Sequence, residues 1–318
     1  MTSADDVPVP PPQSLPAFVE PMLARPGEPF DSGEYLFEVK WDGTRAIAFV
    51  ESGVAPLRLV NRRRRDMTWR YPELAFLANL PAGTVLDGEI VCLDKDGRPD
   101  FQALQSREQV HTQRKAAHSA MACPATYVVF DQLYDRFESV MDLSCGERRE
   151  RLRMLVAATA NPRLVMSEGV TGDGVAYFEK VTGEGLEGVV AKRLNSRYEP
   201  GKRTGAWVKI KKCQTLHCVV IGFVPEGKDD FGSLVVAAQD DGGELRCVGR
   251  VGSGFDRRLR QQINDYLWSH LRDKPVVPNR EKGLWVEPGL YCTVRCMEFT
   301  ADGHFRAPVF VEVTRVVG

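Results

Sequence analysis

Apolar and polar residues alternate along several short runs in the N-terminal part of the chain, a pattern that predicts β-strands. In the first run, Phe37, Val39 and Trp41 fall on one face. Glu38 and Lys40 fall on the other face, because successive side chains of a strand point to opposite sides. The apolar face can pack into a core, so Glu38 and Lys40 are expected to face a cleft or solvent.

The same pattern predicts further strands before residue 212. With the first one, they cover residues 35–41, 45–50, 57–61, 84–93, 126–131, 186–192 and 206–211. After the first strand, the dipeptide Asp42-Gly43 predicts a turn, because this pair readily adopts positive φ.

Helical patterns alternate with these strands. Ser144 and Glu147 have the spacing of a capping box ahead of the apolar residue Leu152, which predicts a helix that begins near Ser144. A second helix is expected to begin after Asp100, at Phe101.

The pattern changes after Cys213 to shorter strands around one amphipathic helix. Strands are predicted at 218–223, 234–239, 245–251, 291–299 and 309–316, and the helix at 255–271. Strands, a helix and more strands in so short a segment are typical of a small Greek-key barrel such as an OB-fold. The sequence therefore predicts an α+β chain with a Pro-rich leader at 1–16, a first domain at 17–212 and a barrel at 213–318.

Composition restricts the classes of function. The chain has 318 residues, 27% of them charged, and a net charge of −1, so any nucleic-acid surface must come from a local cluster. The densest cluster is Arg62–Arg65. No apolar run is long enough for a membrane span, and the N-terminus lacks the pattern of a signal peptide. The eight cysteines are scattered without a C-x-x-C pair, which favours a reducing cytoplasm.

Several predicted strands carry charges on one face. Asp87 and Glu89 share a face, as do Lys209 and Lys211, and Glu187 opens an otherwise apolar strand. Carboxylates bind Mg²⁺, and lysine neutralises phosphate oxygens. The combination suits a polyphosphate and its metal ions.

These residues belong to a series of motifs: E-x-K-x-D-G-x-R from Glu38, N-R…P-E-L, L-D-G-E, F-D-x-L, E-G-V-V-A-K, W-x-K-x-K and R-x-P-x-F. Their order resembles that of the covalent nucleotidyltransferases, and more narrowly that of the bacterial ATP-dependent DNA ligases of the end-joining group. The resemblance covers nearly the whole chain, from Glu38 to Phe310. Residues 248–255 also resemble the second domain of these bacterial enzymes.

The resemblance implies a nucleotidyltransferase (adenylation) domain followed by an OB-fold domain. It also implies an enzyme that seals nicked duplex DNA in DNA repair through a lysyl–AMP and a DNA-adenylate, with ATP as substrate and Mg²⁺ or Mn²⁺ as cofactor. Lys40 would be the nucleophile, with Glu38 and Phe130 on the adenine. Arg45 and Glu89 would engage the ribose or a nearby phosphate.

The remaining roles implied by the resemblance concern phosphates and metal. Lys209 and Lys211 would bind the α-phosphate, and Glu187 a metal ion, together with Glu89. Arg62 would face the 5′-phosphate of the nick. Arg306, in the second domain, would contact the pyrophosphate leaving group when that domain closes about a hinge near Lys212.

Two departures from the family pattern stand out. Arg64 occupies a position that is usually glycine, which predicts a different turn beside Arg62. The chain also ends soon after the Arg306 motif, without the basic residues often seen there. Because the sequence shows no polymerase, nuclease or zinc-finger segment and no extra N-terminal helical domain, it is expected to be a minimal ligase.

Other interpretations remain open from the sequence. An RNA ligase or a GTP-using capping enzyme shares the nucleotidyl–lysine chemistry, and a catalytically silent nucleic-acid-binding protein belongs to another class. A monomer at the bacterial nucleoid, with the end-bridging protein Ku as a partner, is expected by resemblance only. The sequence does not decide the repair pathway.

Overall fold

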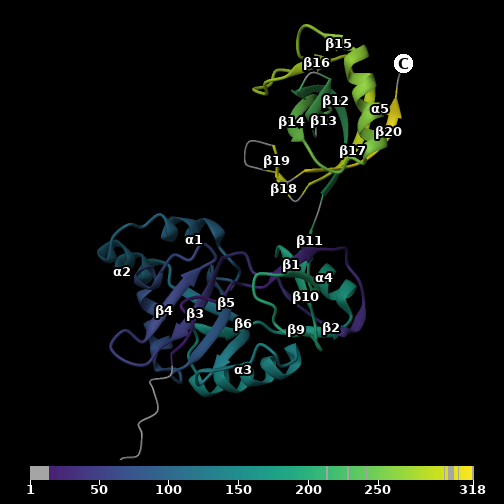
Figure 1. Ribbon diagram of the computed structural model, residues 1–318. Helices are drawn as coiled ribbons and strands as arrows, with labels where there is room; N and C mark the ends of the chain where they lie inside the picture. The colour runs from purple at the N-terminus through teal and green to yellow at the C-terminus, as the bar shows by residue number, and fades with distance from the viewer. Residues whose placement is uncertain are drawn as a thin grey trace, which may run out of the picture. The chain divides into compact units, whose positions relative to one another are not determined.

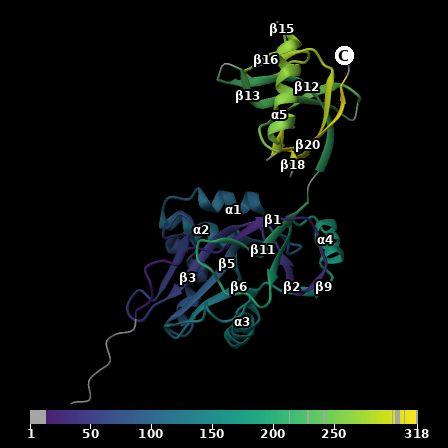
Figure 2. The same cartoon turned by 45° about the vertical axis from the view of Figure 1, so that its right-hand side comes forward.

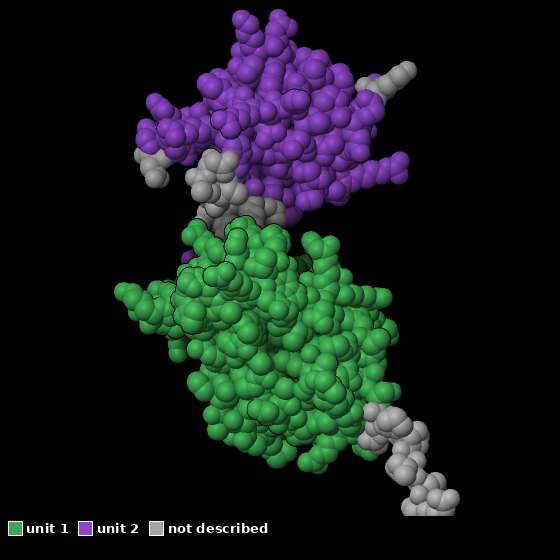
Figure 3. All heavy atoms as spheres, turned by 90° about the vertical axis from the view of Figure 1, so that its left-hand side faces the viewer, with its two compact units in different colours: residues 1–211 green, residues 212–318 purple. Residues whose placement is uncertain are grey.

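The computed structural model describes residues 14–212, 214–227, 229–240, 242–296, 298–299, 304–306 and 308–316. The chain divides into two compact units, Met1–Lys211 and Lys212–Gly318 (Figure 3). Leu15, which the predicted boundary assigned to the leader, is buried in the core of the first unit.

The first unit contains two β-sheets. The five-stranded sheet has the order β1 (Leu23–Pro26), β11 (Arg203–Lys211), β10 (Gly188–Arg193), β2 (Ser32–Val39) and β9 (Gly169–Gly172). The six-stranded sheet has the order β4 (Leu57–Asn61), β3 (Thr44–Val50), β5 (Thr84–Cys92), β6 (Ala125–Asp135) and β7 (Glu138–Ser139), and β8 (Leu164–Met166) also pairs with β6.

Helices cover these sheets. The α-helices are α1 (Phe101–Glu108), α2 (Gln113–Ala122), α3 (Cys145–Thr159) and α4 (Gly174–Gly183), and the 3₁₀ helices are η1 (Thr68–Arg70) and η2 (Pro72–Asn79). α4 packs on β2 and β10, whereas α3 packs on β6 and β8 (Figure 1, Figure 2). The predicted starts of two helices are confirmed, because Asp100 caps α1 and the capping box of Ser144 and Glu147 caps α3.

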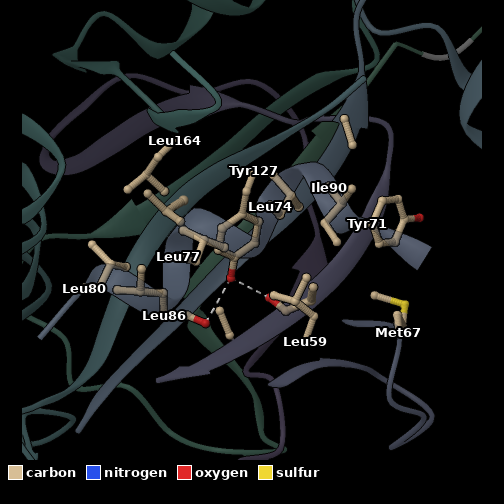
Figure 4. Packing of buried hydrophobic residues seen from close by; sticks show 14 of the residues in the cluster. Leu59, Met67, Tyr71, Leu74, Leu77, Leu80, Leu86, Ile90, Tyr127 and Leu164 are labelled. Carbon is tan, nitrogen blue, oxygen red and sulfur yellow. Dashed lines mark hydrogen bonds between the residues drawn. The ribbon is translucent and has the colours of Figure 1, made fainter. Parts of the chain in front are cut away.

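The six-stranded sheet is buried on both faces. Along β3, Ala46 and Ala48 join one core cluster, and Ile47 and Phe49 join another. The first cluster packs against η2, and within it the Tyr127 hydroxyl lies 2.9 Å from the carbonyl oxygen of Ala46 (Figure 4). Burial on both faces leaves little room for polar side chains except at the edges of the sheet and in its cavity.

The predicted turn at Asp42-Gly43 is wrong in one respect. Neither residue has positive φ, and β2 and β3 belong to different sheets, so the dipeptide carries the chain from one sheet to the other. A Cβ on Gly43 would lie 2.4 Å from the Ile90 carbonyl oxygen and 2.8 Å from Glu89 Cγ. Glycine is therefore required at this position by close approach of β5 and not by its freedom in φ.

In its described residues, the second unit is a β-structure with one long helix. Its strands are β12 (Gln214–Glu226), β13 (Asp230–Gln239), β14 (Leu245–Val251), β15 (Leu271–Arg272), β16 (Leu284–Val286), β17 (Leu290–Cys296), β18 (Glu298–Phe299), β19 (Phe305–Arg306) and β20 (Val309–Val316). β12 pairs with β13, β16 and β17, and all these pairs are antiparallel. The helix α5 (Arg257–Ser269) buries Ile263 and Leu267 in the core that the strands enclose.

Some predicted boundaries differ from the structure. The predicted strand at 291–299 is two strands, β17 and β18, and the predicted helix at 255–271 begins and ends two residues further in, as α5. The sequence pattern missed the strands that are too short to show alternation, namely β1, β7, β8, β9, β15, β16 and β19, and also missed α2 and α4. No helix in the described part of the chain has the length and apolar character to cross a membrane.

Variants of Arg148 and Arg151, both on α3, test whether a buried ion pair stabilises the first unit. The fully buried Arg148 guanidinium donates from Nε to Asp131 at 2.7 Å and from Nη1 to the Leu143 carbonyl oxygen at 2.6 Å. We expect Arg148→Ala to lower the free energy of unfolding by about 3–5 kcal/mol, because it leaves the Asp131 carboxylate buried without its cation.

The matched control is Arg151→Ala, which breaks an exposed ion pair with Asp135 and should cost about 1 kcal/mol or less. Urea denaturation of both variants measures the difference. Equal losses would contradict the structural role given to Arg148.

Candidate active site

A cavity of about 230 Å³ is lined by residues from both sheets of the first unit. Seven of the residues singled out in the sequence line it: Glu38, Lys40, Arg45, Arg62, Glu89, Phe130 and Lys209. Its other lining residues include Lys192, Arg203 and Trp207, which the sequence had not singled out as site residues.

The five-stranded sheet presents one charged face to this cavity. In the register of the sheet, Val190 lies opposite both Glu38 and Lys209, which places these three residues side by side. The other face carries Phe37 and Val208, which pack in an apolar cluster with α4. The predicted alternation is confirmed through Val39.

The alternation fails at Trp41. This residue was predicted to share the core face with Phe37, but β2 ends at Val39 and the strand pattern no longer applies. Trp41 instead lines the cavity and donates its Nε1 hydrogen to Ser167 Oγ at 3.1 Å.

Lys40 is held by the Glu187 carboxylate. Lys40 Nζ lies 2.5 Å from Glu187 Oε2, and Lys211 Nζ pairs with the other oxygen of the same carboxylate. All three side chains are about four-fifths buried, with exposures of 23%, 21% and 19%. One carboxylate therefore bridges two lysine ammonium groups at the edge of the cavity.

The backbone beside Glu187 fixes this arrangement. The Lys40 amide donates to the Gly188 carbonyl oxygen at 2.8 Å, which ties the residue after β2 to the start of β10. Gly188 has φ of 145°, and a Cβ there would lie 2.1 Å from the Ile210 carbonyl oxygen. Glycine is thus required directly after Glu187.

Glu38, which lines the cavity, is part of a buried ion network. Its carboxylate accepts hydrogen bonds from Arg149 Nη1 at 2.5 Å and pairs with Lys192 Nζ at 2.8 Å. Burial raises the pKa of Glu38, and Lys192 and Arg149 oppose that rise. Arg149 comes from α3 and also pairs with Glu168.

Lys192 links the two sheets. Its Nζ donates to the Phe130 carbonyl oxygen at 3.0 Å and lies 4.4 Å from the centre of the Phe130 ring. Val129 and Asp131 of β6 pair with adjacent residues of β5, and Phe130 is the extra residue between them at a register shift. Such a bulge re-aims a side chain, and here the ring lines the cavity.

Arg45 is held in place by the protein itself. It makes a two-pronged contact with Asp87, at 2.9 Å from Nε and 2.5 Å from Nη2, and its Nη1 donates to the Met22 carbonyl oxygen at 2.7 Å. The Tyr198 hydroxyl donates to the same Asp87 carboxylate at 2.7 Å. Arg45 therefore reaches the cavity as a rigid guanidinium with few free hydrogens.

Two other groups at the cavity have shifted pKa values. Burial raises the pKa of Glu89 to about 8, although Arg45 and Lys40 oppose this shift. Burial lowers the pKa of Lys209, and the positive charges of Lys211, Arg203 and Lys40 add to the effect. Both shifts are in the direction that makes the neutral form of the side chain easier to reach.

The turn beside Arg62 is held by the side chain of Asn61. Arg64, which replaces glycine of the family pattern, has φ of 59°, the left-handed conformation that glycine favours. The Asn61 side chain accepts hydrogen bonds from the amides of Arg63 at 2.9 Å and Arg65 at 3.0 Å. Arg64 thus adopts a conformation that glycine favours, and the difference of this turn from that of the family stays a prediction.

Arg306 cannot be placed at this cavity from the structure. Its backbone forms part of β19 in the second unit, and its side chain lies outside the described part of the chain.

Glu187 pairs with Lys40, and the charges of Lys40 and Glu187 both act on the pKa of Glu89, the first lowering it and the second raising it. In the described ranges, no group of three or more His, Cys, Asp or Glu side chains forms a metal site. Mg²⁺ is commonly held by one or two carboxylates together with waters and substrate phosphates. Both Glu187 oxygens pair with lysines here, so this carboxylate would be open to such an ion only once Lys40 or Lys211 turns to a substrate phosphate.

Comparison with known proteins places both units in one family. The family described as ATP dependent DNA ligase domain matches residues 21–211, and the ATP dependent DNA ligase C terminal region matches residues 227–315.

Individual relatives agree with this match. The SPbeta prophage-derived DNA ligase-like protein LigB of Bacillus subtilis is 34% identical, over 92% of this chain and 98% of that protein. The multifunctional non-homologous end joining protein LigD of Pseudomonas aeruginosa is 34% identical over 93% of this chain, which spans only 35% of that relative's length.

A solved structure is also similar. The structure of mycobacterial DNA ligase D complexed with ATP and MES has a TM-score of 0.55 and 32% identity, and the match covers 93% of this chain and 95% of that one. The predicted fold class, an α+β adenylation domain followed by an OB-fold domain, is confirmed.

Glu89→Gln should reveal the raised pKa through the pH dependence of stability. Between the ordinary pKa of 4.5 and the folded value of about 8, the folded chain holds more protons at Glu89 than the unfolded chain does. The contribution of Glu89 to the free energy of unfolding therefore falls as pH rises through that window. We expect the free energy of unfolding of the unmutated protein, relative to that of Glu89→Gln, to decrease between about pH 5 and about pH 8.

Urea denaturation of both proteins at several pH values measures this difference. Glu150→Gln, on the exposed side of α3, is the matched control. A difference that stays constant over the window would contradict the raised pKa of Glu89.

Proposed function

Because this chain belongs to the ATP-dependent DNA ligase family, we propose that it seals nicks with a 3′-hydroxyl and a 5′-phosphate in duplex DNA. Lys40 Nζ attacks the α-phosphorus of ATP, a P–N bond forms, and pyrophosphate leaves. AMP then passes from Lys40 to the 5′-phosphate of the nick. Finally the 3′-hydroxyl attacks that phosphate, and AMP leaves as the phosphodiester forms.

The arrangement around Lys40 Nζ is the observation that supports this proposal. The amine lies at a cavity that also contains an aromatic ring, Phe130, and a carboxylate, Glu38. Lys209 lines the same cavity, and Lys211 shares the Glu187 carboxylate with Lys40. A nucleotide needs an aromatic surface, a polar group for its base and cations for its phosphates, and all of these surround one nucleophile.

Glu187 is the proposed acceptor for the proton that Lys40 must lose. An amine attacks only through a free lone pair, and Glu187 Oε2 lies 2.5 Å from Nζ, within reach of direct proton transfer. Lys211 holds the other carboxylate oxygen, which keeps Glu187 aimed at Lys40.

Glu38 and Phe130 are the proposed site for the base. Phe130 would stack on adenine, and Glu38 would accept a hydrogen bond from its amino group. Guanine has a carbonyl oxygen at the corresponding position, which would face the Glu38 carboxylate without a hydrogen between them. This arrangement favours ATP over GTP as the nucleotide.

The cations of the cavity are the proposed phosphate ligands. Lys209 and Lys211 would neutralise the α-phosphate as charge develops on it, and Glu89 and Arg45 would lie toward the ribose. Glu187 and Glu89 would hold Mg²⁺ or Mn²⁺, which when bound screens the charge of the triphosphate.

Two arginines complete the proposed mechanism. Arg62 lines the cavity and would bind the 5′-phosphate of the nick. Arg306 would contact the departing pyrophosphate, a role that rests on its position in the R-x-P-x-F motif.

The proposed substrate is nicked duplex DNA, and the proposed context is double-strand-break repair by end joining. The relative from Pseudomonas aeruginosa is named for that process, and the share of it that this chain covers is small. Ku as a partner, a monomeric state and a position at the bacterial nucleoid are part of the same proposal.

Lys40→Ala and Lys40→Arg test the function directly. Both should reduce the covalent protein–AMP adduct at least about a hundredfold, because alanine has no nucleophile and guanidinium stays protonated. The measurement is transfer of label from ATP to protein, followed by sealing of nicked DNA and nicked RNA. The control is Lys202→Ala, an exposed lysine of the same unit. A normal adduct yield in Lys40→Ala would refute the assignment, and labelling from GTP would favour a capping-type enzyme.

Arg62→Ala should impair sealing more than adenylation. Loss of a charged hydrogen bond to the 5′-phosphate should slow sealing of a pre-adenylated nick by about tenfold to a hundredfold. Arg63→Ala, an exposed arginine next in the chain, is the control. Equal losses in adduct formation and sealing would place Arg62 with the ATP instead of the nick.

A further inference from the structure

The loop that carries Arg62 contains an unfavourable backbone conformation. Arg64 has φ of 59°, and a residue with a Cβ is disfavoured there relative to glycine. The turn itself is closed by a hydrogen bond from the Arg64 amide to the Asn61 carbonyl oxygen at 2.9 Å. The Asn61 side chain, which accepts from the amides of Arg63 and Arg65, also stabilises the turn, and a partner of the Arg64 side chain outside the turn would add to this.

The Arg64 side chain has such a partner in the N-terminal segment. Its Nε lies 3.1 Å from Glu20 Oε1, and its Nη2 pairs with the same oxygen. The guanidinium also lies 5.3 Å from the centre of the Phe18 ring. An exposed ion pair is usually weak, but this one combines two hydrogen bonds to one carboxylate with an aromatic contact.

Glu20 belongs to a segment that is firmly packed. Leu15, Val19 and Met22 are buried in the core between the sheets. Arg58 Nη1 on β4 donates to the Ala17 carbonyl oxygen at 3.0 Å. Glu20 is therefore presented to the loop from a fixed backbone.

The same segment continues into the cavity. Leu23 and Ala24 line it, and the Met22 carbonyl oxygen accepts a hydrogen bond from Arg45. Arg62, two residues before Arg64 in the same turn, also lines the cavity. Residues 15–24 therefore contact both the proposed nucleotide pocket and the loop that carries Arg62.

We propose that residues 15–24 act as a clamp, in which Glu20 and Phe18 hold Arg64 so that Arg62 stays directed into the cavity. Glu20 and Arg64 are then positioning residues for recognition of the 5′-phosphate. The inference rests on the proposed function in that it takes Arg62 as the ligand of that phosphate.

The test is a double-mutant cycle of Glu20→Ala and Arg64→Gly, with Arg62→Ala as reference. Glu20→Ala alone should raise KM for nicked DNA by about three- to tenfold, with a smaller effect on lysyl–AMP formation. In the Arg64→Gly background, Glu20→Ala should add nothing, because glycine adopts the left-handed conformation without help. Asp142→Ala, which breaks another exposed ion pair, with Arg197, is the control.

Hydrogen exchange of the amides of residues 63–65 gives a readout that does not depend on activity. Glu20→Ala should speed this exchange if the clamp exists, and unchanged exchange or effects that add in the double mutant would overturn the clamp. Normal sealing by Arg62→Ala would instead overturn the role of Arg62 in the proposed function. The two failures are therefore distinguishable.

Discussion

The buried ion network of Glu38 holds together the parts of the molecule that form the site. Glu38 belongs to β2 in one sheet, Arg149 to α3, which packs on the other sheet, and Lys192 reaches from β10 to the Phe130 carbonyl oxygen in β6. Charged groups removed from water are tolerated only when each has its partner, so none of these elements can shift alone. The width of the cavity between the sheets depends on this constraint.

Much of this architecture could be predicted from local patterns. Alternation along β2 and β11 predicted the charged face with Glu38 and Lys209, and the capping box predicted α3. These predictions succeed because period-two and capping signals depend on near neighbours in the chain.

The residues that sequence reasoning missed are those whose role depends on distant contacts. Arg149 stands among several arginines of α3, and nothing local distinguishes it from the exposed Arg151 and Arg153. Lys192 shares a face with Val190, a signal that could have marked it, but its partners lie in β2 and β6. Trp41 was misplaced because the strand ended at Val39, which the alternation could not reveal.

The strand that carries Lys209 and Lys211 is also the last strand of the first unit. β11 ends at Lys211 and β12 begins at Gln214. Two residues of the sequence therefore separate Lys211, which pairs with Glu187, from the first strand of the second unit. Lys211 is thus the last residue of β11 and also shares the Glu187 carboxylate with Lys40. A change of charge at the end of this strand therefore alters the electrostatic environment of the Lys40 amine.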